Sequence, residues 1–158
     1  MVSERIRRLD DRGWTLAELL VVIAVIGILT AVSVPLFVAY LQSATVRAGA
    51  QELRTALNGA KQLAITLRQP ICLQPAGGSA YQLRKTTCGG TVVQATEAPG
   101  ADATGTFQLQ NNVALTVNTA PVFSPLGGAA PAAQFTVTGP TGNSLTVTVS
   151  LAGRITTP

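Results

Sequence analysis

The chain has 158 residues, a net charge of +4 and no histidine, with 11 cationic side chains against 7 carboxylates. This length suits one globular domain with an added segment rather than several domains. Charged residues make up only 11 % of the chain and form no dense basic run, so nothing in the composition calls for nucleic acid as a partner.

The amino-terminal segment 1–13, MVSERIRRLDDRG, is polar and slightly basic, with four arginines against three carboxylates. Basic residues before an apolar run favour the cytoplasmic side of a membrane. From Leu19 to Val46 no residue is charged, which exceeds the roughly 20 residues that an α-helix needs to cross about 30 Å of hydrocarbon. We therefore expect one membrane-spanning helix whose amino terminus lies inside.

Two cleavage sites compete at this span. A secretory signal is cut after its apolar run at small residues of the Ala-x-Ala kind, and residues 30–33, Thr-Ala-Val-Ser, match that pattern poorly. A cut there would also remove the whole anchor. A cut between Gly13 and Trp14 would instead discard the leader, keep the helix and create a new α-amine on Trp14.

Gly13, Trp14, Glu18 and Pro35 together resemble the amino-terminal motif of type IV pilins and type II secretion pseudopilins. In that family a prepilin peptidase cuts after the glycine, the new terminus is methylated, a Glu follows four residues beyond it, and a proline bends the helix. Trp14 departs from the commoner Phe or Met. The resemblance implies an inner-membrane subunit with a periplasmic head, which assembles into a filament with other pilin-type subunits at an inner-membrane assembly platform.

Glu18 is a lone carboxylate inside the apolar run. An acidic residue costs about 3 kcal/mol at the middle of a bilayer, so it tends to be retained where it finds a partner. We expect no partner within its own helix, and the nearest cation is the α-amine of Trp14 in the same chain or in a neighbouring subunit. The alternative is a carboxylate at head-group level that has no role.

Helical periodicity continues beyond the span. Apolar residues recur at alternating spacings of four and three over 46–67, while polar residues occupy the other faces. An unbroken helix from residue 14 to about residue 68 would be roughly 80 Å long. Pro70 should end this helix, and Gly27 and Pro35 are the expected bends.

After Pro70, short alternating segments separated by glycine and proline predict antiparallel strands. The clearest is 145–151, with apolar side chains on one face, and 135–138 is its expected hairpin partner. Residues 95–106 are predicted to be a mobile surface loop. Further strands are expected at 71–73, 81–84, 107–109, 113–117 and 122–123. The predicted fold class is α+β, with a long amino-terminal helix packed on an antiparallel sheet or sandwich.

Cys72 and Cys88 follow the span, which places them outside the cytoplasm if the amino terminus is inside. A disulfide is therefore expected. A shared metal ion is the alternative, but the chain offers no histidine, no CxxC pair and no other thiol. We predict no metal site and no cofactor.

The order of the carboxyl-terminal segments resembles the minor pseudopilin group GspH/FimT. The resemblance lies in 64–72, in the Phe-Ser-Pro-x-Gly segment within 122–127, and in Ala-Gly-Arg-Ile at 152–155, which it places at the end of a last strand. It implies a minor pilin or pseudopilin with a head domain of that type. The predicted parts are a leader at 1–13, a transmembrane and filament-core helix at 14–41, an amphipathic helix at 42–69 and a β-rich head at 70–158.

Some FimT proteins bind DNA during natural transformation through a terminal Gly-Arg-x-Arg. Here Gly153 and Arg154 are followed by Ile155 and Thr156, so the second arginine is missing. A pilus-tip DNA receptor is thus the alternative function, with Arg84, Lys85 and Arg154 as the candidate phosphate contacts.

The side-chain inventory argues against catalysis. After the leader the chain carries four carboxylates, Glu18, Glu52, Glu97 and Asp102, none of which makes a convincing acid/base pair. The glycine pairs at 77–78 and 89–90 read as turns rather than phosphate-binding loops. We predict a structural subunit that is not an enzyme.

Overall fold

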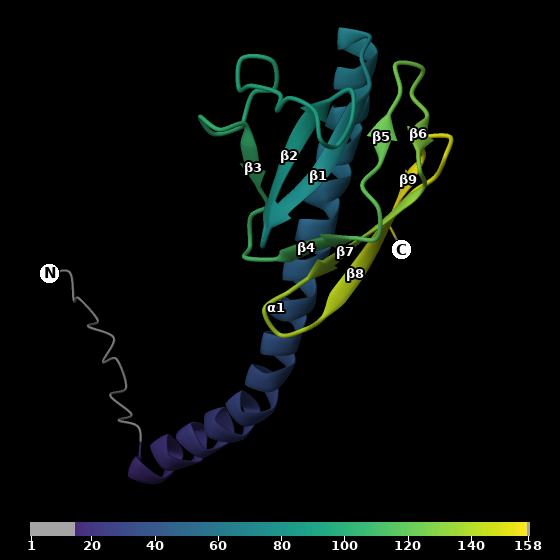
Figure 1. The fold of residues 1–158 in the computed structure, drawn as a ribbon. Coiled ribbons are helices and arrows are strands. Elements are labelled where there is room, and N and C mark those ends of the chain that lie inside the picture. The colour runs from purple at the N-terminus through teal and green to yellow at the C-terminus, as the bar shows by residue number, and fades with distance from the viewer. Residues whose placement is uncertain (1–14, 158) are drawn as a thin grey trace, which may run out of the picture. The chain divides into compact units, whose positions relative to one another are not determined.

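The computed structural model describes residues 15–157, so the predictions for the leader, Gly13 and Trp14 lie outside the described residues. One helix, α1 (Leu16–Leu67), precedes the strands (Figure 1). These are β1 (Ile71–Gly77), β2 (Ala80–Lys85), β3 (Thr106–Gln108), β4 (Ala114–Val117), β5 (Val122–Phe123), β6 (Ala129–Ala130), β7 (Ala133–Thr138), β8 (Ser144–Val149) and β9 (Ile155–Thr156). The chain divides into two units, and the boundary along the sequence lies between Ala39 and Tyr40.

The first unit contains the apolar half of α1. Every side chain from residue 15 to residue 39 is exposed, and the most apolar window of the helix has a mean hydropathy of 2.8. The hydroxyls of Thr30 and Ser33 donate to the carbonyls of Ile26 and Leu29, at 2.7 and 2.8 Å, so these polar groups are satisfied within the helix as hydrocarbon requires. By length and composition this helix can cross a membrane.

The second unit begins with the other half of α1, which packs on the sheets through one apolar face. This face confirms the predicted periodicity and comprises Val46, Gly49, Ala50, Leu53, Leu57, Ala60 and Ala64. The helix ends at Leu67, and Arg68 adopts a positive φ of 53° two residues before Pro70. A residue in the left-handed conformation followed by proline is a common helix stop, and it places the end where the sequence predicts it.

Two antiparallel sheets complete the head domain. The first has the strand order β3-β2-β1-β5-β6 and the second the order β4-β7-β8-β9. Both contribute to one core with the second half of α1, in which Leu53, Phe123 and Phe135 are fully buried. The α+β prediction, a long helix packed on antiparallel strands, is confirmed.

The strands differ from the prediction in their ends and in their number. Strand β8 ends at Val149, and Leu151 is 66 % exposed in the turn that follows, so the apolar face predicted to run to residue 151 stops early. Strands β6 and β9 were not predicted, and residues 152–154, expected to lie at the end of the last strand, instead connect β8 to β9. The segment 95–105 lies in a surface loop before β3, anchored by Ala98 in the core and by the 2.6 Å pair of Lys85 with Glu97, and its mobility stays a prediction.

Candidate functional site

The amino-terminal end of α1 carries a reciprocal cap. The backbone N–H and the hydroxyl of Thr15 both donate to Oε2 of Glu18, each at 3.1 Å, and the Glu18 N–H donates to Oγ1 of Thr15 at 3.2 Å. This is a capping box, which satisfies two of the four N–H groups that a helix start leaves unpaired. The carboxylate also lies at the positive end of the helix dipole.

This cap corrects the expectation that Glu18 has no partner within its own helix. The signal was present in the sequence, since Thr15 and Glu18 form the Thr-x-x-Glu pattern of a capping box. The second expected partner, the α-amine of Trp14, lies outside the described residues. Pro35 lies within α1, where its effect on the helix axis stays a prediction.

The predicted disulfide between Cys72 and Cys88 is present, with the two Cα atoms 5.1 Å apart. Cys72 is fully buried in β1, so the bond ties the loop that follows β2 to the first sheet. Both thiols are consumed by this bond, which removes the shared-metal alternative. Among residues 15–157, no three carboxylates, thiols or imidazoles gather as metal ligands.

The three candidate DNA contacts are not brought together as free cations. The Arg84 guanidinium donates to Gln82 Oε1 at 2.9 Å and to the Gly90 carbonyl at 3.0 Å. Lys85 pairs with Glu97. Both lie on β2 of the first sheet, whereas Arg154 precedes β9 of the second. The structure gives these residues no common surface, and their contact with DNA stays a prediction.

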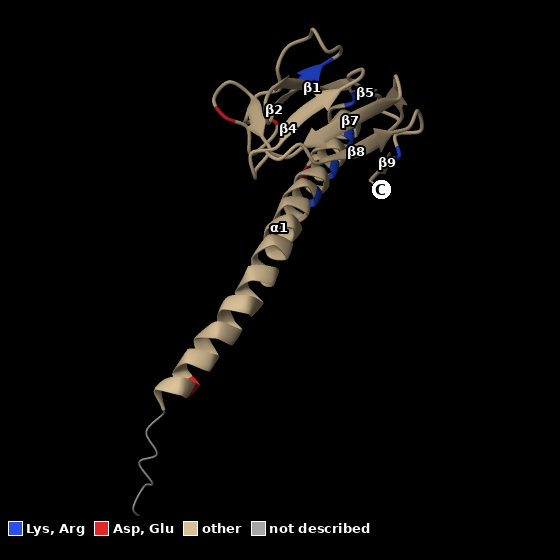
Figure 2. Ribbon diagram, turned by 90° about the horizontal axis from the view of Figure 1, so that it is seen from below, with Lys and Arg blue, Asp and Glu red and all other residues tan. Residues whose placement is uncertain are grey.

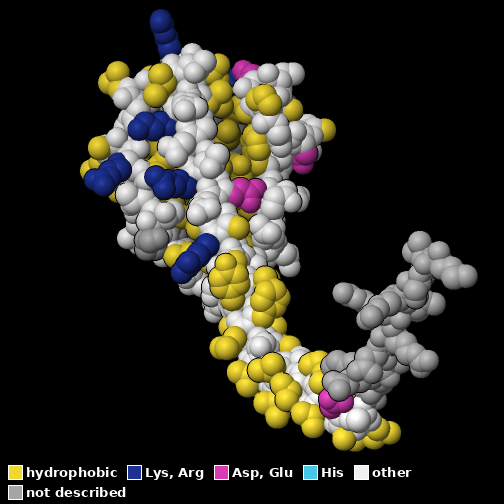
Figure 3. All heavy atoms as spheres, turned by 180° about the vertical axis from the view of Figure 1, so that it is seen from behind, with side chains coloured by type: hydrophobic (Ala, Val, Ile, Leu, Met, Phe, Trp, Pro, Cys, Tyr) yellow, Lys and Arg dark blue, Asp and Glu magenta, His cyan; other side chains and the backbone are white. Residues whose placement is uncertain are grey.

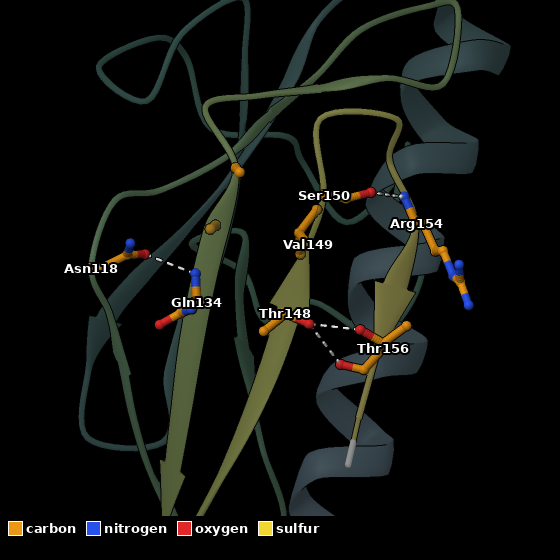
Figure 4. A pocket seen from close by; sticks show the side chains of 9 residues that line it. Asn118, Gln134, Thr148, Val149, Ser150, Arg154 and Thr156 are labelled. Atoms are coloured by element: carbon orange, nitrogen blue, oxygen red, sulfur yellow. Dashed lines mark hydrogen bonds between the residues drawn. The ribbon is translucent and has the colours of Figure 1, made fainter.

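A shallow hollow of about 710 Å³ lies over β7, β8 and β9, and Figure 4 shows its lining. Its polar groups bond one another: Thr148 Oγ1 lies 2.6 Å from Thr156 Oγ1, and Asn118 accepts from the Gln134 N–H at 2.8 Å. Arg154 is its one charged side chain and points away from the others (Figure 4). The hollow therefore holds no pair of groups suited to acid/base chemistry.

The turn that carries Arg154 is fastened to α1. Lys61 Nζ donates to the Gly153 carbonyl at 3.0 Å. Gly153 has a φ of 69°, and a Cβ at this position would collide with the carbonyl oxygen of Gly127. Only glycine fits here, so Gly153 has a structural reason that is independent of any ligand.

A groove of about 470 Å³ runs along α1, between the helix, β2, β3 and the loop that contains Ala98. Figure 3 shows it as a hollow lined with hydrophobic side chains, with carboxylates nearby. The rings of Tyr81 and Phe107 stack in it, with centroids 5.1 Å apart. Burial, together with the nearby Glu52 carboxylate, raises the pKa of Tyr81 to about 12. The groove is lined by Ala56, Gly59, Leu63, Tyr81, Leu83 and Phe107, with Glu52 and Glu97 at its rim.

The head-domain carboxylates accept hydrogen bonds that fix loops. A hydrogen bond from Lys85 keeps the pKa of Glu97 below its usual value, and the Thr104 hydroxyl and Thr106 backbone N–H do the same for the pKa of Asp102. Glu52 accepts from the backbone N–H of Gln110 at 2.9 Å and joins α1 to the segment before β4. Depressed pKa values at exposed carboxylates indicate structural acceptors rather than proton donors.

An apolar amino-terminal helix that continues into a head of two antiparallel sheets defines a pilin-like protein. The minor pilin FimU of Pseudomonas aeruginosa has a similar fold, with a TM-score of 0.55, 16 % identity and coverage of 75 % of this chain and 92 % of that one. The minor pseudopilin EpsH from the type 2 secretion system of Vibrio cholerae matches with a TM-score of 0.54, 11 % identity and coverage of 72 % and 95 %.

The chain belongs to the GspH family, described as type II transport protein GspH, which it matches over residues 49–153. Residues 8–34 match the prokaryotic N-terminal methylation motif. No curated protein matches the sequence. The chain is thus a pilin-type or pseudopilin-type protein, a structural subunit rather than an enzyme, and this family assembles with other pilin subunits. Its apolar helix and its family fit a membrane-anchored subunit of a periplasmic filament.

Proposed function

We propose that the chain is a precursor that a prepilin peptidase cuts after Gly13 and that is then methylated on Trp14. The observation that carries this proposal is the union, in one chain, of a methylation motif over residues 8–34 with a GspH-type head over residues 49–153. The motif region contains Gly13, Trp14 and Glu18 in the spacing expected of a processed pilin.

After cleavage, residues 14–41 anchor the subunit in inner-membrane lipid and later enter the filament core. Residues 42–69 pack on the head, and residues 70–158 form the head on the periplasmic side. The Cys72–Cys88 bond supports this orientation, because structural disulfides persist in oxidising compartments such as the periplasm. Extraction from the membrane requires an assembly platform and an energy source elsewhere, since the chain has no nucleotide-binding motif.

Glu18 sets the axial register between neighbouring subunits in this proposal. Its Oε2 is occupied by Thr15, which fixes the carboxylate at the helix start and leaves Oε1 for a neighbour's α-amine. Within an apolar bundle a misaligned pair would leave an amine and a carboxylate unpaired, at a cost of several kcal/mol. One stagger is therefore favoured over the others.

Two variants separate pairing from capping. Glu18→Gln keeps the capping box, in which Gln serves as well as Glu, but removes the charge. Thr15→Ala weakens the cap and keeps the charge. We expect both to insert and to lose the leader, and we expect the Glu18→Gln share in sheared filaments to fall about tenfold, with Thr15→Ala near the parent level. Normal incorporation of Glu18→Gln beside a defective Thr15→Ala would assign Glu18 to helix capping alone.

Mass spectrometry of the mature amino terminus tests the processing step directly. The proposal requires a chain that begins at Trp14 and is one methyl group heavier than the unmodified sequence. A product that retains Met1, or one that begins beyond Pro35, would exclude pilin-type assembly.

A further inference from the structure

Three cations on the second half of α1, Arg47, Arg54 and Lys61, recur at intervals of seven residues, and Arg68 follows at the same interval just beyond the helix end at Leu67. Seven residues advance an α-helix by about 10 Å and return to nearly the same face, with a drift of about 20°. Figure 2 shows blue segments recurring along this part of α1. We name these four residues the basic stripe. The three helical members form a row of positive charge about 20 Å long on one face of α1, and Arg68 adds a fourth cation at its carboxyl end.

The members of the basic stripe are available to a partner. Arg47, Arg54 and Arg68 are exposed, and within residues 15–157 their side chains make no hydrogen bond or ion pair. Lys61 is half-buried and uses one donor on the Gly153 carbonyl, which fixes its position. Figure 3 shows Lys and Arg side chains gathered to one side of the apolar groove.

The helix itself does not neutralise the basic stripe. Partners on a helix surface lie three or four residues apart. At those distances from the four cations the helix offers Ser, Ala, Gln, Leu, Asn and Ile, with no carboxylate. The helix carboxylate nearest in sequence, Glu52, lies at the rim of the groove on the opposite flank.

A second copy of this chain is a poor partner for the basic stripe. The described residues of the head contain three carboxylates, and each is engaged: Glu52 with Gln110, Glu97 with Lys85, and Asp102 with the backbone and hydroxyl of Thr104. They lie on the groove rim and in a loop, not in a row. Charge complementarity therefore calls for a different protein.

Duplex DNA fits the basic stripe less well. Each strand presents a phosphate every 3.4 Å of axis, so a cation about every 10 Å would meet roughly one phosphate in three. A seven-residue spacing matches the periodicity of another α-helix instead.

We propose that the basic stripe docks an acidic helix face of a different pilin-type subunit, with carboxylates spaced by about seven residues. This inference rests on the proposed function, because the partner is a subunit of the same filament. It explains why a minor subunit would take a defined neighbour: the stripe attracts an acidic helix and repels another copy of itself. The drift of the stripe around α1 requires the two helices to cross at a small angle.

The test uses the full chain in non-ionic detergent and a synthetic helical peptide of four heptads, built from Ala and Gln with one Glu per heptad. A second peptide has the same composition, with its Glu residues five positions apart and therefore spread around the helix. Fluorescence anisotropy at low salt should show the heptad peptide binding several-fold more tightly than the spread peptide. Binding should be lost near 1 M salt, where the Debye length falls to about 3 Å.

Variants locate the contact. Arg54→Gln should weaken binding about threefold and Arg47→Gln with Arg54→Gln about tenfold, whereas Arg54→Lys should bind like the parent. The matched control is Arg54→Gln with Thr55→Arg. This variant restores the net charge but moves the cation about 100° around the helix, so its binding of the heptad peptide should stay weak. Equal affinity for both peptides, full recovery by Thr55→Arg, or tighter stripe-dependent binding of a duplex oligonucleotide would each overturn the proposal.

Filament assays separate this inference from the proposed function. Arg47→Gln with Arg54→Gln should be processed normally yet enter filaments several-fold less well. If that variant is incorporated normally while Glu18→Gln is defective, the docking role of the basic stripe is refuted and the proposed function stands. If the parent chain does not lose its leader, the proposed function is refuted, independently of the peptide-binding result.

Discussion

Gly49 allows α1 to approach the second sheet, and its replacement by alanine is a sharp test of the packing. A Cβ at Gly49 would lie 3.0 and 3.1 Å from the two γ-methyls of Val113 and 3.2 Å from Cγ1 of Val137. Both valines are almost fully buried, at 1 % and 0 % exposure, so neither has room to move aside. Gly59 lies on the same helix with nothing within 4 Å of an added Cβ, which makes it the matched control.

The two substitutions should have opposite signs. Alanine is favoured over glycine within a helix by about 1 kcal/mol, so Gly59→Ala should raise the free energy of unfolding by about that amount. At Gly49 the same gain is opposed by overpacking of a tight core, which costs roughly 1–3 kcal/mol. Gly49→Ala should therefore be neutral to about 2 kcal/mol destabilising, and should lie about 1–3 kcal/mol below Gly59→Ala.

Urea unfolding of the full chain in detergent, followed by far-ultraviolet circular dichroism, measures both values. Val113→Ala should relieve the clash, so Gly49→Ala should cost less in that background than in the parent, with a coupling of about 0.5–3 kcal/mol. Equal stabilisation by Gly49→Ala and Gly59→Ala would refute the close approach of helix and sheet at this point.

Two further outcomes test the head domain. Tyr81 has a pKa of about 12 in the folded chain, raised from the usual value of 10.0, so its contribution to stability is complete below pH 10.0 and is lost as the pH rises towards 12. In a Tyr40→Phe chain, tyrosinate absorbance should show this one late transition, and Glu52→Gln should move it to lower pH. Replacing Cys72 and Cys88 by alanine should lower the free energy of unfolding by about 3 kcal/mol, the chain-entropy value for a loop of this length, and an unchanged urea midpoint would contradict it.

Much of the fold could be predicted because its signals are local. The apolar positions from Val46 to Ala64 repeat with helical period, and Arg68 and Pro70 end the helix where a stop is expected. The disulfide could be predicted because the chain has only two cysteines. The Thr15–Glu18 cap is equally local and could have been predicted from its Thr-x-x-Glu spacing, although the apolar residues around Glu18 favour a partner in another subunit.

Other features depend on distant pairings that local patterns do not encode. The division into two sheets is set by contacts such as Cys72 with Val122, which are 50 residues apart. Strand β6 is two alanines with little strand propensity, and it forms because β5 lies beside it. The bonds of Arg84 with Gln82 and Gly90 follow from the turn after β2, so the sequence could nominate this cation but not show that it was occupied.

Strand β9 has two residues and forms the outer edge of the second sheet, where Val149 pairs with Ile155. It covers part of β8, a strand of six residues rich in Val and Thr. Loss of these last residues, by proteolysis or by a premature stop codon, would uncover backbone donors and acceptors that can template cross-strand aggregation. A recombinant affinity tag at the carboxyl end should therefore follow a flexible spacer, and the processing that we propose would remove a tag placed ahead of residue 1.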